Sequence, residues 1–164
     1  MGKINNIEKF DADFFNVSFK QAHILDPMIR MLLEHTYEAI IDAGVNPKQL
    51  RGKNTAVIMG ISFLESQTNF FYENLQADGL SIIGGNKSTT ANMISNLLDL
   101  KGPSYTVDAA CSSSAYAIAL GYYNIMSGQC EDAIIGTSHL CLHPSVTQQF
   151  FYLGSFTKIF TKIT

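Results

Sequence analysis

One cysteine of this sequence stands where a thiol could act as a nucleophile. A short strand-like run from Tyr105 to Ala110 leads into Cys111, and the residues from Ser112 to Ser127 include no charged side chain. This pattern predicts a strand followed at once by a helix. The first N–H groups of a helix have no partner within it and lie at the positive end of its dipole, which favours a thiolate over a thiol. Cys111 is therefore a candidate nucleophile, and the alternative is a buried structural cysteine.

The uncharged helix predicted after Cys111 also has an expected position. A surface helix needs a polar face, so we expect this one to be buried at the centre of a domain. Three serines, Ser112 to Ser114, begin it. We expect their hydroxyls to bind free N–H groups of the first turn, as serine does at helix starts.

Other cysteines and histidines invite different chemistry. His139, Cys141 and His143 alternate, with Cys130 nearby, but this spacing matches no common zinc signature, so we predict no metal site. A hydrolytic pair of cysteine and histidine stays open, because the distance between Cys111 and a histidine cannot be read from sequence. The four histidines available for it are His23, His35, His139 and His143.

The elements that must position Cys111 follow from local patterns. Asp26-Pro27 begins a helix that ends at Gly44, and a second helix runs from Ser88 or Thr89 to just before Gly102. Strands that alternate with helices predict an α/β fold with a largely parallel sheet. The predicted strands are residues 55–61, 105–109 and 132–137, and a short helix is expected at residues 68–75.

Composition excludes several classes of function. The 164 residues carry a net charge of −3 with eleven scattered Lys and Arg, so we expect no nucleic-acid partner. No run of about twenty apolar residues predicts a membrane span. The odd number of cysteines, three, fits a reducing compartment, and the polar N-terminus lacks the apolar run of a signal peptide. We expect a soluble, cytoplasmic protein.

Several motifs in series carry a family resemblance. Residues 108–114 read Asp-Ala-Ala-Cys-Ser-Ser-Ser, which resembles the active-site segment Asp-Thr-Ala-Cys-Ser-Ser-Ser of β-ketoacyl synthases. Similar stretches occur in the same order at residues 9–44, 91–104, 105–136 and 141–154. The chain thus resembles the N-terminal half of the ketosynthase domain of animal-type fatty acid synthases and related polyketide synthases, over roughly residues 4–154.

This resemblance implies a fold and a reaction. The fold is α/β and thiolase-like, N-terminal half only: a partial mixed sheet with a central buried helix. Residues 1–164 would form one partial ketosynthase N-terminal domain, with a loop-rich opening at 1–25 and a divergent tail at 155–164. Cys111 would accept an acyl chain from the phosphopantetheine arm of an acyl carrier protein, and its backbone N–H would donate to the oxyanion. No cofactor or metal is bound directly. The family is homodimeric through the strand that corresponds to residues 104–108.

Departures from the family pattern limit what is expected. The family's two catalytic histidines belong to the C-terminal half and its first central strand precedes the first residue of this sequence. Met28 and Met93 stand where Gln and Arg are usual. We therefore expect a fragment of a β-ketoacyl synthase in which Cys111 accepts the acyl chain but decarboxylative condensation with a malonyl thioester does not follow. The alternative is a non-catalytic truncated paralogue that acts through dimer-type interaction with a full synthase.

Overall fold

A parallel sheet of three strands forms the middle of the structure. The computed structural model describes residues 4–68 and 83–154. The strands are β1 (Thr55–Gly60), β2 (Ser104–Val107) and β3 (Asp132–Thr137), in the order β2-β1-β3. Val57 pairs with Ser104 on one side and with Ile134 on the other, and both ladders are parallel. The predicted α/β fold with a largely parallel sheet is confirmed.

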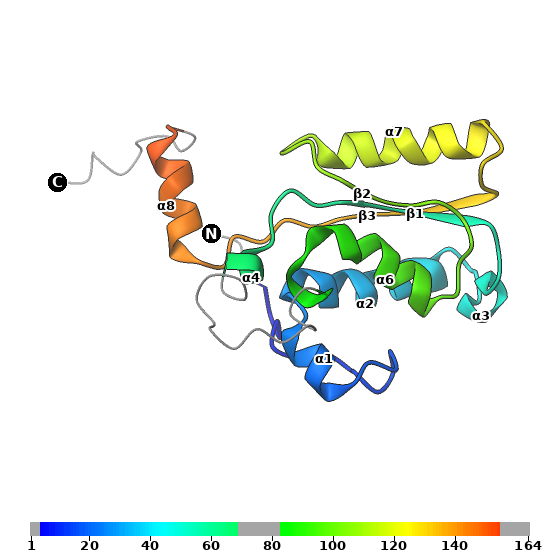
Figure 1. Ribbon diagram of the computed structural model, residues 1–164, viewed down its shortest axis with the longest axis horizontal. Helices are drawn as coiled ribbons and strands as arrows, with labels where there is room; N and C mark the ends of the chain where they lie inside the picture. Colours follow the sequence, from blue (N-terminus) through cyan, green and yellow to red (C-terminus); the bar gives the residue numbers. More distant parts are fainter. Residues whose placement is uncertain (1–3, 69–82, 155–164) are drawn as a thin grey trace.

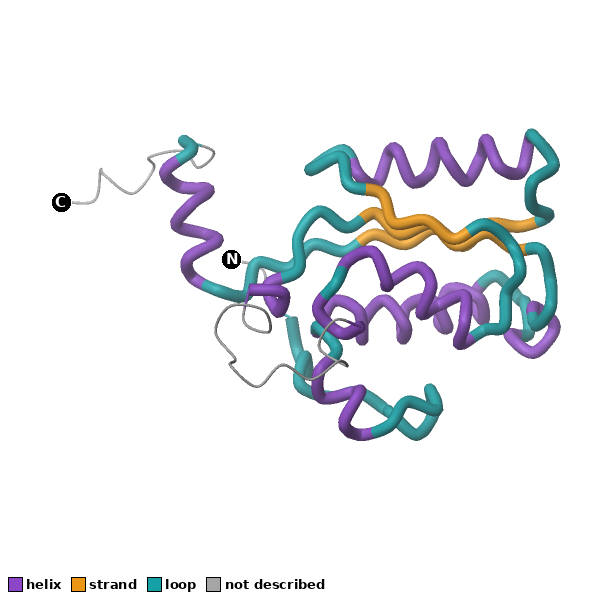
Figure 2. The backbone as a smooth tube through the Cα atoms, in the orientation of Figure 1, coloured by secondary structure: helices purple, strands orange, loops and turns teal. Residues whose placement is uncertain are grey.

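Helices cover the two faces of this sheet unequally. Figure 1 shows α2 (Pro27–Asp42) and α6 (Thr90–Leu97) on one face and α7 (Ser113–Met126) on the other. The same three layers can be followed in Figure 2, where helices lie on both sides of the strands. The remaining elements are α1 (Phe19–Ile24), α3 (Pro47–Leu50), α4 (Glu65–Thr68), the 3₁₀ helix η2 (Lys87–Thr89) and α8 (Pro144–Tyr152). The helix predicted at 68–75 lies almost wholly outside the described residues.

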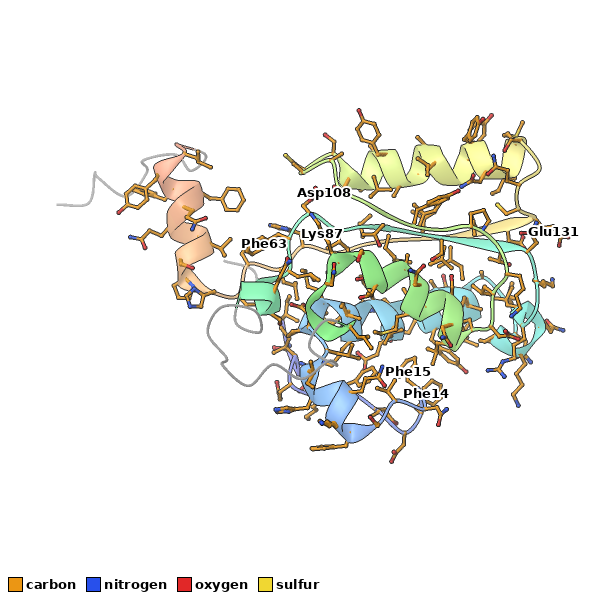
Figure 3. All side chains as sticks on the ribbon, viewed as in Figure 1. Phe14, Phe15, Phe63, Lys87, Asp108 and Glu131 are labelled. Atoms are coloured by element: carbon orange, nitrogen blue, oxygen red, sulfur yellow. The ribbon has the colours of Figure 1, made fainter. Side chains whose placement is uncertain are left out.

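Strand β1 is the centre of the core. All six of its residues are buried, which is typical of a parallel strand covered by helices on both faces of the sheet. Successive side chains point to opposite faces, so Val57 and Met59 pack toward α2 and α6, whereas Ala56 and Ile58 pack toward α7. The cluster on the α2 and α6 side holds far more large side chains (Figure 3).

Helix α2 begins and ends as its sequence predicts. The Asp26 carboxylate accepts a hydrogen bond from the N–H of Met28 at 2.8 Å, and Pro27 occupies the first turn. The second carboxylate oxygen of Asp26 accepts a hydrogen bond from the N–H of Ser66 at 3.1 Å. Both oxygens of this residue, which is only 2% exposed, therefore have partners. Gly44, with φ at 73°, follows the helix in the left-handed region.

The expected burial of α7 on all sides is wrong for this chain. Its buried residues form one stripe, and they are small or polar. On the opposite face Tyr122 is 66% exposed and Met126 67% exposed. The absence of charge correctly indicated a helix unsuited to water, but the described residues provide only the sheet as a packing partner. The buried stripe consists of Ser113, Ala117, Gly121 and Asn124.

Candidate active site

Cys111 lies in a tight turn that joins β2 to α7. It immediately precedes Ser112, the N-cap of α7, and its side chain is exposed. Ala110 before it has φ at 49°, in the left-handed region that residues other than glycine rarely occupy. Such a conformation persists only where surrounding contacts hold it, and it costs about 1–3 kcal/mol. The structure thus places the cysteine at the helix start, where the sequence predicts it.

The carbonyl of Ala110 is the point at which the turn is held. It accepts hydrogen bonds from the Ser113 N–H at 3.1 Å, the Ser113 hydroxyl at 2.7 Å and the Ser62 hydroxyl at 2.9 Å. The two hydroxyls are 3.1 Å apart, and each has a single proton, so a hydroxyl that donates to the other does so in place of the carbonyl. A trans peptide points its C=O and N–H in opposite directions. The bonds to the Ala110 carbonyl therefore also fix the direction of the Cys111 N–H.

The serines do not act as the sequence predicted. Ser112 makes no side-chain cap hydrogen bond, because its φ of −93° and ψ of 1° lie outside the extended conformation that an N-cap needs. Ser113 reaches backward instead, and its hydroxyl accepts from the N–H of Ala109 at 2.9 Å. The expectation of hydroxyls on first-turn N–H groups is wrong for these two residues. Ser113 braces the turn that leads into the helix.

An ion pair holds the other side of the turn. Lys87 Nζ pairs with one oxygen of Asp108, whose second oxygen accepts from the N–H of Ala110 at 3.2 Å. The hydrogen bond from Lys87, and then that from Ala110, lower the pKa of the Asp108 carboxyl. Lys87 also donates to the carbonyl of Ser62 at 3.3 Å. Figure 3 shows Lys87 and Asp108 together beside the start of α7.

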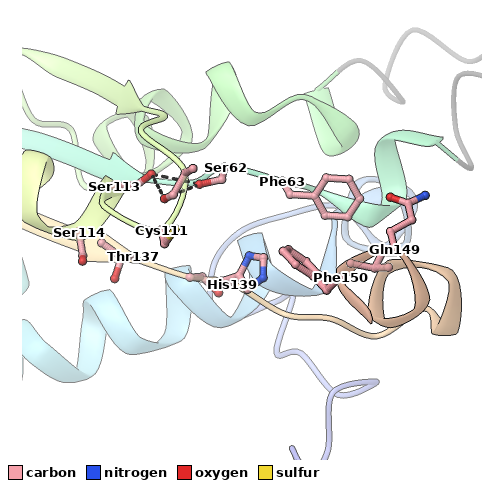
Figure 4. A pocket seen from close by; sticks show the side chains of 13 residues that line it. Ser62, Phe63, Cys111, Ser113, Ser114, Thr137, His139, Gln149 and Phe150 are labelled. Atoms are coloured by element: carbon pink, nitrogen blue, oxygen red, sulfur yellow. Dashed lines mark hydrogen bonds between the residues drawn. The ribbon is translucent and has the colours of Figure 1, made fainter. Parts of the chain in front are cut away.

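A cavity of about 520 Å³ opens beside Cys111. It lies at the carboxyl ends of β1 and β3, the usual position for ligands of a parallel sheet. Figure 4 shows Cys111, His139, Phe63 and Phe150 along its walls. Apolar side chains come from α8 and from the residues after β1, and hydroxyls come from the turn and from the end of β3. The thiol therefore faces a mainly apolar space with polar groups at one end.

The four histidines lie in different places. Only His139 lines this cavity. His35 pairs with Glu38 at 2.9 Å on the surface of α2, and the ring of His143 accepts from the N–H of Ser145 at the start of α8. Among the described residues no hydrogen bond joins a histidine to Cys111. His139 Nε2 lies 3.2 Å from Cys141 Sγ instead. The hypothesis of a hydrolytic pair of Cys111 and a histidine is therefore not supported by any contact among the described residues.

Metal coordination and membrane insertion are two further functions that the arrangement of side chains and helices can indicate. Within residues 4–68 and 83–154, no three His, Cys, Asp or Glu side chains are arranged to hold a metal ion. Cys130 is only 4% exposed and packs under α7, apart from the other two cysteines. In the same parts of the chain, none of the helices has the length and apolarity that crossing a membrane requires.

Two residues of the site were missed at the level of sequence. Ser62 lies 51 positions from Ser113, and Lys87 lies 21 positions from Asp108. Neither belongs to a motif around the cysteine, and no local spacing indicated a contact. The only signal was positional, because Ser62 follows the end of a predicted strand, where parallel-sheet sites form.

Comparison with known proteins connects the fold and the site to a family. Residues 1–158 match the family described as "Beta-ketoacyl synthase, N-terminal domain". The fatty acid synthase of the goose Anser anser anser is 46% identical over 153 residues, which cover 93% of this chain and 44% of that sequence. "Probable polyketide synthase 1" of Dictyostelium discoideum is 38% identical, over 90% of this chain and 5% of that sequence.

Solved structures agree with the sequence relatives. The ketosynthase from module 6 of the bacillaene synthase of Bacillus subtilis 168 superposes with a TM-score of 0.82 at 30% identity, over 96% of this chain and 26% of that one. An oxazolomycin ketosynthase domain from Streptomyces albus JA3453 gives a TM-score of 0.84 at 30% identity, over 93% and 27%. The partial thiolase-like fold is thereby confirmed. The chain spans less than half the length of these relatives.

Proposed function

The chain belongs to the β-ketoacyl synthase family, and from this premise we propose that Cys111 is its acyl-accepting nucleophile in fatty acid or polyketide synthesis. The observation that carries the proposal is the braced peptide between Ala110 and Cys111, which presents an exposed thiol to the 520 Å³ cavity. Pockets for small ligands usually measure about 300–1,000 Å³, so an acyl chain is a suitable occupant.

The proposed step is a thioester exchange. The Cys111 thiolate attacks the carbonyl carbon of an acyl group carried on the phosphopantetheine arm of an acyl carrier protein. A bond forms between the carbonyl carbon and the Cys111 sulfur, the bond to the carrier sulfur breaks, and the carrier thiol leaves with a proton. The fixed N–H of Cys111 donates to the oxyanion of the intermediate. The chain is thus an acyltransferase by family, and it needs no bound cofactor or metal for this step.

Condensation is a separate question. We propose that these 164 residues alone accept an acyl group but do not join it to a malonyl unit, because the described part of the cavity contains one histidine, His139, already in contact with Cys141. General acid–base help contributes about 10²- to 10⁴-fold to such steps. We further propose that residues 1–164 form one partial ketosynthase domain of a cytoplasmic protein.

A second candidate function is interaction with another chain, without catalysis. Strand β2 is at the edge of the sheet and, among the described strands, pairs only with β1. An open edge is a template for a strand of another chain. This favours a homodimer through residues 104–108, or a non-catalytic paralogue that pairs with a full synthase through the same strand.

One experiment tests both the thiol and the condensation. The protein is incubated with the hexanoyl thioester of N-acetylcysteamine, and peptide mass spectrometry maps the modified cysteines. We expect a hexanoyl group on Cys111, absent from Cys111→Ala and removable by hydroxylamine, and no β-ketoacyl product after malonyl thioester is added. An unmodified Cys111 would refute the acyl-accepting role, and a condensation product would refute the proposed limit.

A further inference from the structure

A second cysteine lies beside a basic group at the same end of the sheet. Cys141 is exposed, and its Sγ lies 3.2 Å from Nε2 of His139. The two residues are two apart in the loop between β3 and α8, and this loop brings the thiol and the ring together. His139 also packs edge-on against Phe150, with ring centroids 6.4 Å apart at 85°. The imidazole is thus held between an aromatic ring and a thiol.

This pair has the composition of an activated nucleophile. A thiol reacts through its thiolate, and a neighbouring imidazole can take the proton. With the ring proton on Nδ1, Nε2 is free to accept the proton from sulfur. Among the described residues, no histidine makes this contact with Cys111.

The position of the pair indicates its substrate. His139 lines the same cavity as Cys111, and the Cys141 sulfur contacts His139, so an acyl group at Cys141 would lie at the rim of this cavity. Phe63 and Phe150 supply apolar walls there (Figure 4). A carbonyl compound with an apolar tail and a thiol leaving group therefore fits both the nucleophile and its surroundings.

We propose that Cys141 and His139 form a second thioester-accepting site at the rim of this cavity. His139 removes the proton from Cys141, and the thiolate attacks the carbonyl carbon of an acyl thioester. The new carbon–sulfur bond replaces the bond to the departing thiol, which leaves with the proton from His139. The step needs no oxidant or other co-reactant. It also does not depend on Cys111, so the two sites can be tested separately.

The test is made in the Cys111→Ala protein, with the acetyl thioester of N-acetylcysteamine as the probe. Peptide mass spectrometry follows acetylation of Cys141, with buried Cys130 as an internal reference. We expect a hydroxylamine-sensitive acetyl group on Cys141, formed at least tenfold faster than on the same peptide in urea-unfolded protein. His139→Gln should lower the rate in the folded protein at least tenfold, because general acid–base help of this kind usually contributes about 10²- to 10⁴-fold.

The matched control is His35→Gln, which removes an exposed histidine paired with Glu38 on α2. It should leave acetylation of Cys141 unchanged, and a circular dichroism spectrum should show that both variants are folded. Equal rates in His139→Gln and His35→Gln, or a Cys141 that reacts no faster than in unfolded protein, would overturn the proposal. Acetylation of Cys111 in the Cys141→Ala protein is scored on a different peptide, so failure at one thiol does not obscure the other.

Discussion

Cys111 and Cys141 are both exposed thiols near one cavity, but the protein holds them by different means. Cys111 sits in a turn fixed by Ser62, Ser113 and Asp108, directly before a helix of fourteen residues. No side-chain base contacts it in the described part of the chain. Cys141 has an imidazole at 3.2 Å, whereas no helix starts directly after it. We therefore expect the reactivity of Cys111 to depend on its position before the helix, and the reactivity of Cys141 to depend on the neighbouring imidazole.

This difference gives a measurement with an internal reference. The alkylation rates of both cysteines can be read from one sample by mass spectrometry with iodoacetamide. Changes in the turn should alter only the rate of Cys111, and changes at His139 should alter only that of Cys141. The ratio of the two rates therefore separates local effects from loss of the whole fold, which would change both.

Ser113→Ala should have the largest effect on the Cys111 rate. It removes the hydroxyl that accepts from Ala109 N–H and donates to the Ala110 carbonyl, at a residue only 5% exposed. An unsatisfied buried N–H costs about 1–3 kcal/mol, and 1.4 kcal/mol corresponds to about tenfold. We expect the alkylation of Cys111 to slow about tenfold while that of Cys141 stays constant.

The control for that variant is Ser112→Ala, whose hydroxyl makes no cap hydrogen bond. It should change the Cys111 rate less than about twofold, since surface substitutions without a specific contact usually change stability by less than about 0.5 kcal/mol. Equal effects of the two substitutions would show that Ser113 does not brace the turn.

Gly60→Ala should act through packing on the same turn. A Cβ at this position would lie 3.0 Å from the carbonyl oxygen of Ser113 and 2.9 Å from Cγ2 of Thr137. Overpacking of this kind costs about 1–3 kcal/mol. Because the backbone of Ser113 must move, we expect the Cys111 rate to fall about threefold or more, with a lower urea midpoint for unfolding.

Gly121→Ala is the matched control on the same face of the sheet. Its Cβ would meet Cδ1 of Ile135 at 2.6 Å, the end of a flexible side chain that can turn away. The ratio of Cys111 to Cys141 alkylation should stay as in the wild type. If Gly121→Ala changed this ratio as much as Gly60→Ala, the strain would not be specific to the turn.

Sequence predicted the framework of this site better than its details. Asp26 and Pro27 at the start of α2, Gly44 after its end, and the apolar strands gave the sheet and its parallel connections. These features depend on neighbours in sequence or on a period of two or 3.6 residues, which a single sequence displays. The helix start at Cys111 belongs to the same class.

What sequence could not predict depends on distant neighbours. The contacts of Ser62 and Lys87 with the turn cross 48 and 21 positions, and no local spacing encodes them. The exposed outer face of α7 was missed for a related reason. The absence of charge shows that a helix is poorly suited to water, but it does not reveal which segments are present to cover it. The pair of His139 and Cys141 was visible as an alternation, but only contact distances distinguish a proton-transfer pair from a metal ligand set.

Lys87→Met should have a smaller effect, because the ion pair with Asp108 is partly exposed, at 37% and 40% of the two side chains. Pairs of this kind contribute about 0–1 kcal/mol, so we expect the Cys111 rate to fall about two- to threefold. Lys87→Arg should restore most of the rate, and the difference between the variants should shrink in high salt because exposed charges are screened. A wild-type alkylation rate of Cys111 in the Lys87→Met protein would show that this ion pair does not help to hold the turn.

The smallest effect concerns pH. The pKa of Asp108 is lowered in the folded protein, first by the hydrogen bond from Lys87 and then by that from Ala110. A lowered folded pKa gives stability that is fully present above the unfolded value of about 3.9, and this stability is lost as the pH falls through the folded value. The difference in unfolding free energy between wild type and Asp108→Asn should therefore be constant from about pH 5 to 8 and should decline as the pH falls below about 4. Urea titrations at several pH values measure this free-energy difference. A difference that disappears between pH 5 and 8 would show that a group other than Asp108 stabilises the turn.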